Sequence, residues 1–68
     1  MTADEALTKA IELKRKWRDG SPDDRADVAQ VVARGPAILA AAVSLEVVPG
    51  FAAFGERELW VRMIEAAQ

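Results

Sequence analysis

The feature that most constrains the fold is a stretch of twenty-one residues, 35–55, that reads GPAILAAAVSLEVVPGFAAFG and contains one charge, Glu46. The whole chain has only 68 residues. A chain of this size buries about 60% of the surface that its unfolded form exposes. Few other residues are therefore present to cover so apolar a segment. The stretch must be a membrane segment, part of a core, or a surface for a partner.

The length of the stretch argues against a membrane span. A helix over residues 37–48 would be about 18 Å long at 1.5 Å per residue, whereas the hydrocarbon layer of a bilayer is about 30 Å thick. A longer span would have to pass through Pro49-Gly50 and would bury Glu46. We therefore expect no membrane partner for this chain.

The beginning of the chain predicts an amphipathic helix over about residues 3–18. Thr2 and Glu5 have the spacing of a capping box, in which each side chain bonds the backbone N–H of the other residue. Asp19-Gly20 is expected to end the helix, with Gly20 in the left-handed conformation that often follows a helix. The predicted apolar face recurs at three- and four-residue steps, at Ala6, Leu7, Ala10, Ile11, Leu13 and Trp17.

A second helix is predicted over about residues 22–34. Ser21 can cap this helix, and Pro22 occupies the first helical position, where proline is favoured. The two helices would form an αα-hairpin with a short loop. We expect Val28, Val31 and Val32 to face inward and Arg25, Asp27, Gln30 and Arg34 to face solvent.

The apolar stretch itself allows two structures. Gly35-Pro36 ends the second helix, and the alanines of residues 37–48 favour a hydrophobic third helix. Apolar residues also alternate with their neighbours after Ala42, so a short β-hairpin over residues 43–54 is the alternative. The segment LEVVPGFAAFGERE resembles the strand–turn–strand of the HU-type histone-like proteins, which keeps this alternative open. The chain lacks the basic arm that follows in that family.

A C-terminal helix is predicted from Glu56 to about Ala67. Its expected apolar face consists of Leu59, Trp60, Met63, Ile64 and Ala67. The predicted fold is thus all-α, a single domain over residues 1–68 in which three to four short helices form a small bundle. The alternative is an α+β fold that contains the hairpin over residues 43–54.

Composition removes most catalytic chemistry. The chain has no cysteine, no histidine and no tyrosine, which are the usual sources of thiolate nucleophiles, zinc ligands and general bases. The formal net charge of −2 lacks the basic excess of nucleic-acid modules. We expect a protein that is not an enzyme and that binds no cofactor or metal. The missing cysteine and an N-terminus without the pattern of an export signal favour a cytoplasmic location.

Two charged motifs have both a structural and a functional interpretation. Asp23, Asp24 and Asp27 spell D-D-x-x-D, which resembles the magnesium–diphosphate motif of prenyl-chain enzymes. So short a chain encloses no pocket of the usual size, and we interpret these aspartates as a helix cap and a solvated face. Residues 14–18, KRKWR, can contact phosphate or an anionic membrane. We instead expect Trp17 in the core and the cations near the negative end of the helix dipole.

A helix-turn-helix over the second and third helices is the other functional hypothesis. A recognition helix needs donors such as Arg, Asn or Gln that reach base edges, and residues 37–48 offer only Ser44 and Glu46 as polar side chains. A DNA-associated regulator is therefore the alternative function.

The function that the sequence favours is a small protein-interaction or assembly module, either a homo-oligomer or a subunit of a larger assembly. Covering all of the apolar side chains of residues 36–54 is difficult for this chain, and a large exposed apolar patch usually marks an interaction site. The partner is expected to be a protein, with no small-molecule substrate and no nucleic acid. A composition rich in Ala, Val and Arg is typical of high-GC bacteria and their phages. The predicted interaction surface consists of Ile38, Leu39, Leu45, Val48, Phe51, Phe54, Trp60 and Met63.

Overall fold

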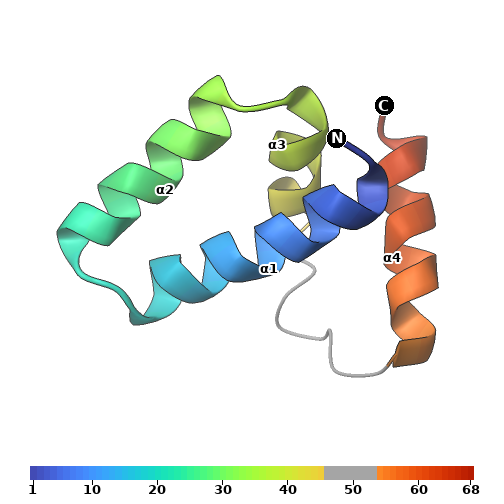
Figure 1. The fold of residues 1–68 in the computed structure, drawn as a ribbon, viewed down its shortest axis with the longest axis horizontal. Coiled ribbons are helices and arrows are strands. Elements are labelled where there is room, and N and C mark those ends of the chain that lie inside the picture. Colours follow the sequence, from blue (N-terminus) through green and yellow to red (C-terminus); the bar gives the residue numbers. More distant parts are fainter. Residues whose placement is uncertain (46–53) are drawn as a thin grey trace.

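The computed structural model describes residues 1–45 and 54–68, which form four α-helices (Figure 1). These helices are α1 (Ala3–Asp19), α2 (Pro22–Arg34), α3 (Ala37–Ser44) and α4 (Phe54–Ala66). The all-α prediction is confirmed, and the described residues contain no strand, so the α+β alternative receives no support. Val43 and Ser44 are helical, and most of the remaining residues of the alternative hairpin lie outside the described part of the chain.

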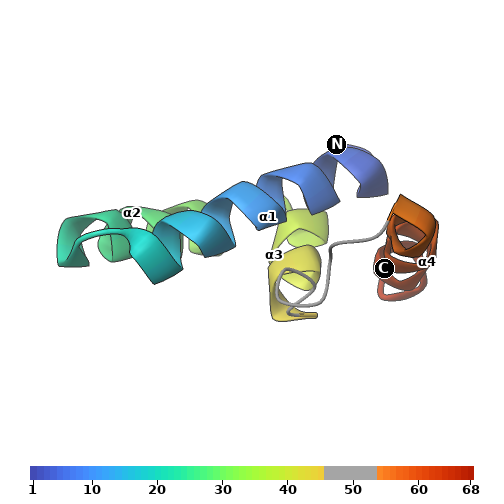
Figure 2. The same cartoon turned by 90° about the horizontal axis from the view of Figure 1, so that it is seen from below.

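The α1–α3 pair forms the centre of the fold. α1 and α3 contact each other and each of the other two helices. α2 lies antiparallel to α1, in the predicted αα-hairpin, and α4 lies on the far side of the α1–α3 pair (Figures 1 and 2). Among the described residues, α2 and α4 make no contact with each other.

Capping boxes set the first residues of α1 and α2. The Thr2 hydroxyl accepts a hydrogen bond from the Glu5 backbone N–H at 3.1 Å, and the Thr2 N–H donates to Glu5 Oε1 at 2.9 Å. Ser21 and Asp24 repeat this arrangement at the start of α2, with hydrogen bonds of 3.3 and 3.0 Å. Each box satisfies backbone N–H groups that a helix start leaves without a partner. Both predicted helix starts are confirmed.

Gly20 ends α1 in an extended conformation, so the predicted left-handed conformation is wrong. Its φ is −91° and its ψ is 174°. The position is crowded, because a Cβ there would lie 2.7 Å from the Cβ of Asp24 and would also press on the Lys16 carbonyl. The Asp24 side chain folds back over this turn to complete the capping box of α2. Glycine is therefore favoured by the close approach of two helix ends and not by a positive φ.

The core joins α1, α3 and α4 through small side chains. Its buried members are Ala3, Ala6, Leu7 and Ala10 of α1, Ala42 of α3 and Ile64 of α4. Alanines on facing helices let the backbones approach closely, and the larger Leu7 and Ile64 fill the remaining space, each with an exposed fraction of 0%. A second buried cluster joins Leu13 of α1, Val28 of α2 and Leu39 of α3.

Arg57 connects α4 to the first turns of α1. Its Nε donates to Asp4 Oδ1 at 2.8 Å, and its Nη2 donates to Thr8 Oγ1 at 2.6 Å and to the Asp4 carbonyl at 3.2 Å. The Arg57 side chain is 30% exposed, so these hydrogen bonds are partly shielded from water. They fix the direction from which α4 packs against α1.

The buried face of α4 differs from the predicted one. Ile64 is buried, and Trp60 and Val61 are partly buried against the same core. Leu59 and Met63, which the sequence places on the inner face, are 57% and 39% exposed. The Arg57 hydrogen bonds explain the difference, because they turn toward α1 the side of the helix that contains Val61 and Ile64.

The inner face of α2 is narrower than predicted. Val28 is buried and Val32 is partly buried, as expected, but Val31 is 40% exposed. Among the four described helices, α2 packs against α1 and α3 and not against α4, so no third helix covers the row of side chains that contains Val31. The expectation of solvent exposure is confirmed for Arg25, Asp27, Gln30 and Arg34.

Acid should weaken the α1 capping box. The hydrogen bond from the Thr2 backbone N–H, with a smaller contribution from the Thr2 hydroxyl, lowers the pKa of Glu5 below its usual 4.5. A carboxyl whose pKa is lower in the folded than in the unfolded state stabilises the fold above its unfolded pKa. This stabilisation is lost as the pH falls below 4.5 and through the folded value. Glu5→Gln keeps a hydrogen-bond acceptor but does not titrate.

We therefore expect the unfolding free energy of the wild-type chain to exceed that of Glu5→Gln at neutral pH, and the difference to shrink on acidification. Urea titrations followed by far-UV circular dichroism, from about pH 6 to about pH 3, measure this difference. A difference that stays constant over the range would contradict the titration of Glu5 in the capping box.

Removing Arg57 should destabilise the fold more than removing another arginine of α4. Arg57→Ala loses partly shielded hydrogen bonds to Asp4 and Thr8, and we expect a cost of about 1–2 kcal/mol. Arg62→Ala is the matched control, since Arg62 pairs with Glu58 at 3.1 Å while the two side chains are 73% and 77% exposed. Its cost should be below about 0.5 kcal/mol. Equal losses in urea unfolding would show that Arg57 does not hold α4 in place.

Candidate functional site

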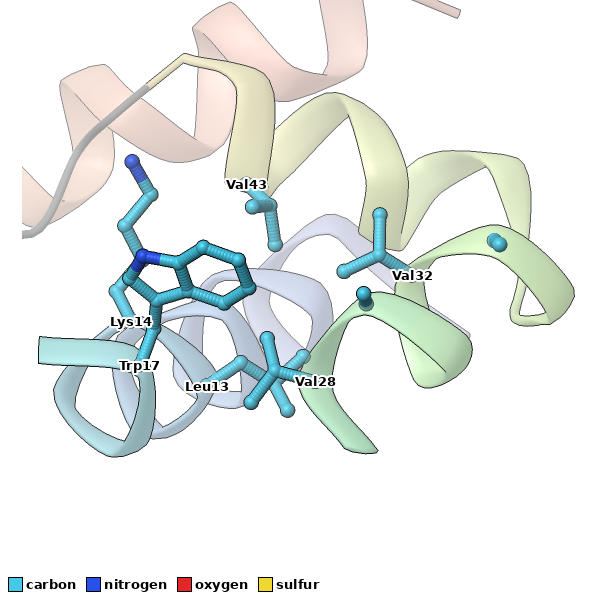
Figure 3. Close-up of a pocket in the computed structure, with 8 residues that line it drawn as sticks. Leu13, Lys14, Trp17, Val28, Val32 and Val43 are labelled. Atoms are coloured by element: carbon cyan, nitrogen blue, oxygen red, sulfur yellow. The ribbon is translucent and has the colours of Figure 1, made fainter. Parts of the chain in front are cut away.

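An apolar groove lies between the last turns of α1, the middle of α2 and the end of α3 (Figure 3). Its volume is about 490 Å³, which is within the range of sites that enclose a ligand or a cluster of partner side chains. Lys14 is the one charged side chain among the described residues of the lining. The lining consists of Leu13, Lys14, Trp17, Val28, Ala29, Val32, Ala33 and Val43.

The groove exists because α1 is much longer than α3. α1 has 17 residues and α3 has 8, so α3 packs against α1 only as far as the level of Leu13. Beyond that level, α2 is the one described helix that lies beside the last turns of α1. The small side chains of Ala29 and Ala33 leave space on the α2 side of the groove.

Two polar contacts hold the α1–α2 hairpin in this shape. Arg25 Nε donates to the backbone carbonyl of Trp17 at 3.0 Å, which satisfies one carbonyl at the end of α1. Lys16 Nζ lies 4.0 Å from Asp27 Oδ2. An exposed ion pair contributes little stability, but both contacts cross from one helix to the other. They keep α2 beside the last turns of α1.

Trp17 forms one wall of the groove, so the prediction that it is a core residue is wrong. Its side chain is 48% exposed. Figure 3 shows the indole ring standing at one side of the groove, with Val32 and Val43 on the other. Leu13 and Val28, which are buried, lie beside the Trp17 ring. A half-exposed tryptophan next to apolar side chains is typical of protein interfaces.

The rim of the groove beside α1 is basic. Residues 14–19 contain four basic side chains and one acidic one. Arg18 Nε donates to Asp19 Oδ1 at 3.0 Å, and this hydrogen bond lowers the pKa of Asp19 and raises the pKa of Arg18. Lys14, which lines the groove, forms no ion pair with the described residues. The groove therefore offers apolar contact together with one cation at its edge.

The part of the predicted interaction surface that lies on α3 is mostly buried. Leu39 is 2% exposed and belongs to the second core cluster, so it is a core residue and not a surface residue. Ile38 and Leu45 are partly buried and pack against the main core. The predicted interaction surface includes these three residues, but the central place of α3 leaves little of their side chains at the surface.

The remaining predicted residues are distributed differently. Trp60 is partly buried against the core, and Met63 is 39% exposed on α4. Val48 and Phe51 lie outside the described residues, and so does the side chain of Phe54, the first residue of α4. None of the five predicted residues whose side chains are described lines the groove. One pattern in the sequence indicates the α2 wall of the groove. Ala29 and Ala33 form a row with four-residue spacing directly beside the row of Val28 and Val32.

The other motifs have structural roles. Of the three aspartates of D-D-x-x-D, Asp24 completes a capping box and Asp27 pairs with Lys16. The described residues contain no group of three His, Cys, Asp or Glu side chains that could hold a metal ion. α3 is packed among the other helices, and the Ser44 hydroxyl donates to the Ala40 carbonyl of the same helix at 2.8 Å. No described side chain of α3 is thus positioned to reach a base edge.

Comparison with protein-family models, with curated proteins and with solved structures finds no match to this chain. The four described helices are each too short or too polar to cross a lipid bilayer. The function of this chain is therefore inferred from the geometry and chemistry of the described residues.

The two tryptophans should differ in their contribution to stability. Trp17→Ala removes a half-exposed side chain and is expected to cost about 1 kcal/mol. Trp60→Ala removes a partly buried side chain from the main core and should cost about 3 kcal/mol. Urea unfolding followed by far-UV circular dichroism measures both. If Trp17→Ala lowered the free energy of unfolding more than Trp60→Ala did, Trp17 would be a core residue and would not form a wall of the groove.

Proposed function

We propose that this chain is a small, non-enzymatic protein-interaction module whose groove binds an apolar α-helical segment of a protein partner. The observation that carries this proposal is Trp17, which is 48% exposed beside an apolar lining. The sequence favours an interaction surface around residues 36–54. The described residues support instead a surface made mainly by α1 and α2, to which α3 contributes Val43.

A helix fits this groove better than a small molecule does. Sites for small molecules combine an apolar lining with several polar groups that orient the ligand, whereas Lys14 is the only charged side chain among the described lining residues. A helix presents a row of side chains at three- and four-residue spacing, and such a row inserts between two packed helices. The described lining residues also include no carboxylate, hydroxyl or thiol, which supports a role without catalysis.

The wider setting is also part of the proposal. A chain without cysteine is typical of a reducing compartment, which supports action in the cytoplasm. The composition supports a bacterial or phage source. The second candidate function, a DNA-associated regulator, has the basic rim of residues 14–18 in its favour. Binding to heparin or DNA that weakens steeply with salt would support that regulator.

The test places a charge inside the groove and the same charge outside it. Ala29→Glu introduces a carboxylate into the lining, and Ala26→Glu introduces it at another exposed position of α2. The two changes are matched in helix propensity and in net charge. Urea unfolding should show similar stability for both variants, because neither alanine is buried.

Wild-type, Ala26→Glu and Ala29→Glu chains are used as bait in extracts of the native source, and retained proteins are quantified by mass spectrometry. We expect a protein, either a different one or further copies of this chain, to be retained by the wild type and Ala26→Glu and reduced at least about tenfold with Ala29→Glu. Equal retention by all three baits would show that the groove is not the binding site.

A further inference from the structure

We propose that the helix bound in the groove is α4 of a second copy of this chain, inserted through Leu59 and Met63. This inference rests on the proposed function and names the partner. Leu59 is 57% exposed and Met63 is 39% exposed. They are four residues apart and therefore lie next to each other on one side of the helix. We call this pair the α4 ridge.

The α4 ridge and the groove match in shape. On α2, the small side chains of Ala29 and Ala33 are also four residues apart. Large side chains at this spacing on one helix fit beside small ones at the same spacing on another, which is the commonest way in which helices pack. The methionine of the ridge is flexible and adapts to an irregular apolar surface. Opposite the alanines, Trp17 provides the second wall that would close over the ridge.

The two surfaces cannot meet within one molecule. α2 and α4 lie on opposite sides of the α1–α3 pair (Figures 1 and 2) and make no contact among the described residues. Arg57 holds the inner side of α4 against α1 through Asp4 and Thr8. The α4 ridge is therefore directed away from its own groove and is available only to another copy.

The charges around the two surfaces are opposite. Residues 14–34, which surround the groove, contain six basic and four acidic side chains. The charged side chains of α4 are three carboxylates, Glu56, Glu58 and Glu65, and two guanidinium groups, Arg57 and Arg62. A segment of net charge +2 thus meets a helix of net charge −1. Lys14, which has no ion-pair partner among the described residues, lies at the edge of the groove where a carboxylate of the second copy would approach.

Such a contact joins two different surfaces, the ridge and the groove. It forms a closed two-fold dimer when each copy inserts its ridge into the groove of the other, and a larger ring or a growing chain when the geometry does not allow this exchange. A mixture of a groove variant and a ridge variant distinguishes the contact from other modes of self-association, because one intact groove and one intact ridge remain.

The experiment uses two variants of the full chain, Ala29→Glu in the groove and Leu59→Glu in the ridge, and measures mass by sedimentation equilibrium. The wild-type chain, of 7.4 kDa, should give an average mass that rises from that of the monomer to that of the dimer or beyond as concentration rises toward about 1 mM, with salt weakening the association. Each variant alone should remain monomeric. An equimolar mixture should form a heterodimer and nothing larger, since one intact groove meets one intact ridge and the two altered surfaces repel each other.

Far-UV circular dichroism and urea unfolding confirm that both variants fold, and Met63→Glu is a second ridge variant whose result should match that of Leu59→Glu. A monomeric wild-type chain at about 1 mM, or an equimolar mixture that stays monomeric, would overturn the proposal. So would a Leu59→Glu chain that associates as the wild type does while Ala29→Glu does not. In that last case the groove would still bind a protein segment, so the proposed function would stand with a different occupant.

Discussion

The close packing of α3 against α1 is the contact on which the rest of the structure depends. Ala42 of α3 and Ala6 and Ala10 of α1 are each 0% exposed, and side chains this small allow two helices to approach closely. α2 and α4 then pack on opposite sides of this pair. Because the central helix has only 8 residues, it covers only part of α1. Both candidate surfaces follow from this shortage of covering chain, since α2 and α4 each have an outer side that no other described helix covers.

Polar contacts decide how these apolar surfaces are presented. The capping boxes at Thr2 and Ser21 set where α1 and α2 begin, and the hydrogen bond from Arg25 to the Trp17 carbonyl holds the hairpin closed. Arg57 then selects which side of α4 faces α1. These contacts are partly or fully exposed, so their individual contributions to stability are small. Their effect on geometry is larger, because the rotation of α4 decides whether Leu59 and Met63 lie inside or outside.

The proposed groove and the proposed α4 ridge explain why this chain keeps large apolar side chains exposed. A domain of this size has little apolar surface to spare for both a core and an interface. Here four of the nine buried core residues are alanines, and Trp17, Leu59 and Met63 remain exposed. Insertion of the α4 ridge of one copy into the groove of another would bury these three side chains together. The described part of the apolar stretch, residues 35–45, mostly packs in or against the core instead of forming a surface for a partner.

Local sequence determined the helices, while tertiary packing decided the candidate site. The boundaries of α1 and α2 follow from capping boxes, Pro22 and Gly20, which act through neighbouring backbone groups and can therefore be recognised without a structure. The predicted α4 is close to the observed one because its apolar side chains recur at helical spacing. Periodicity, however, identifies an apolar side of a helix without showing which part of that side another helix covers. Tertiary contacts decide the burial of single residues. The short α3 buries its own Leu39 and leaves Trp17 and Val31 exposed. The exposure of Leu59 depends on the hydrogen bond between Arg57 and Asp4, which are 53 positions apart.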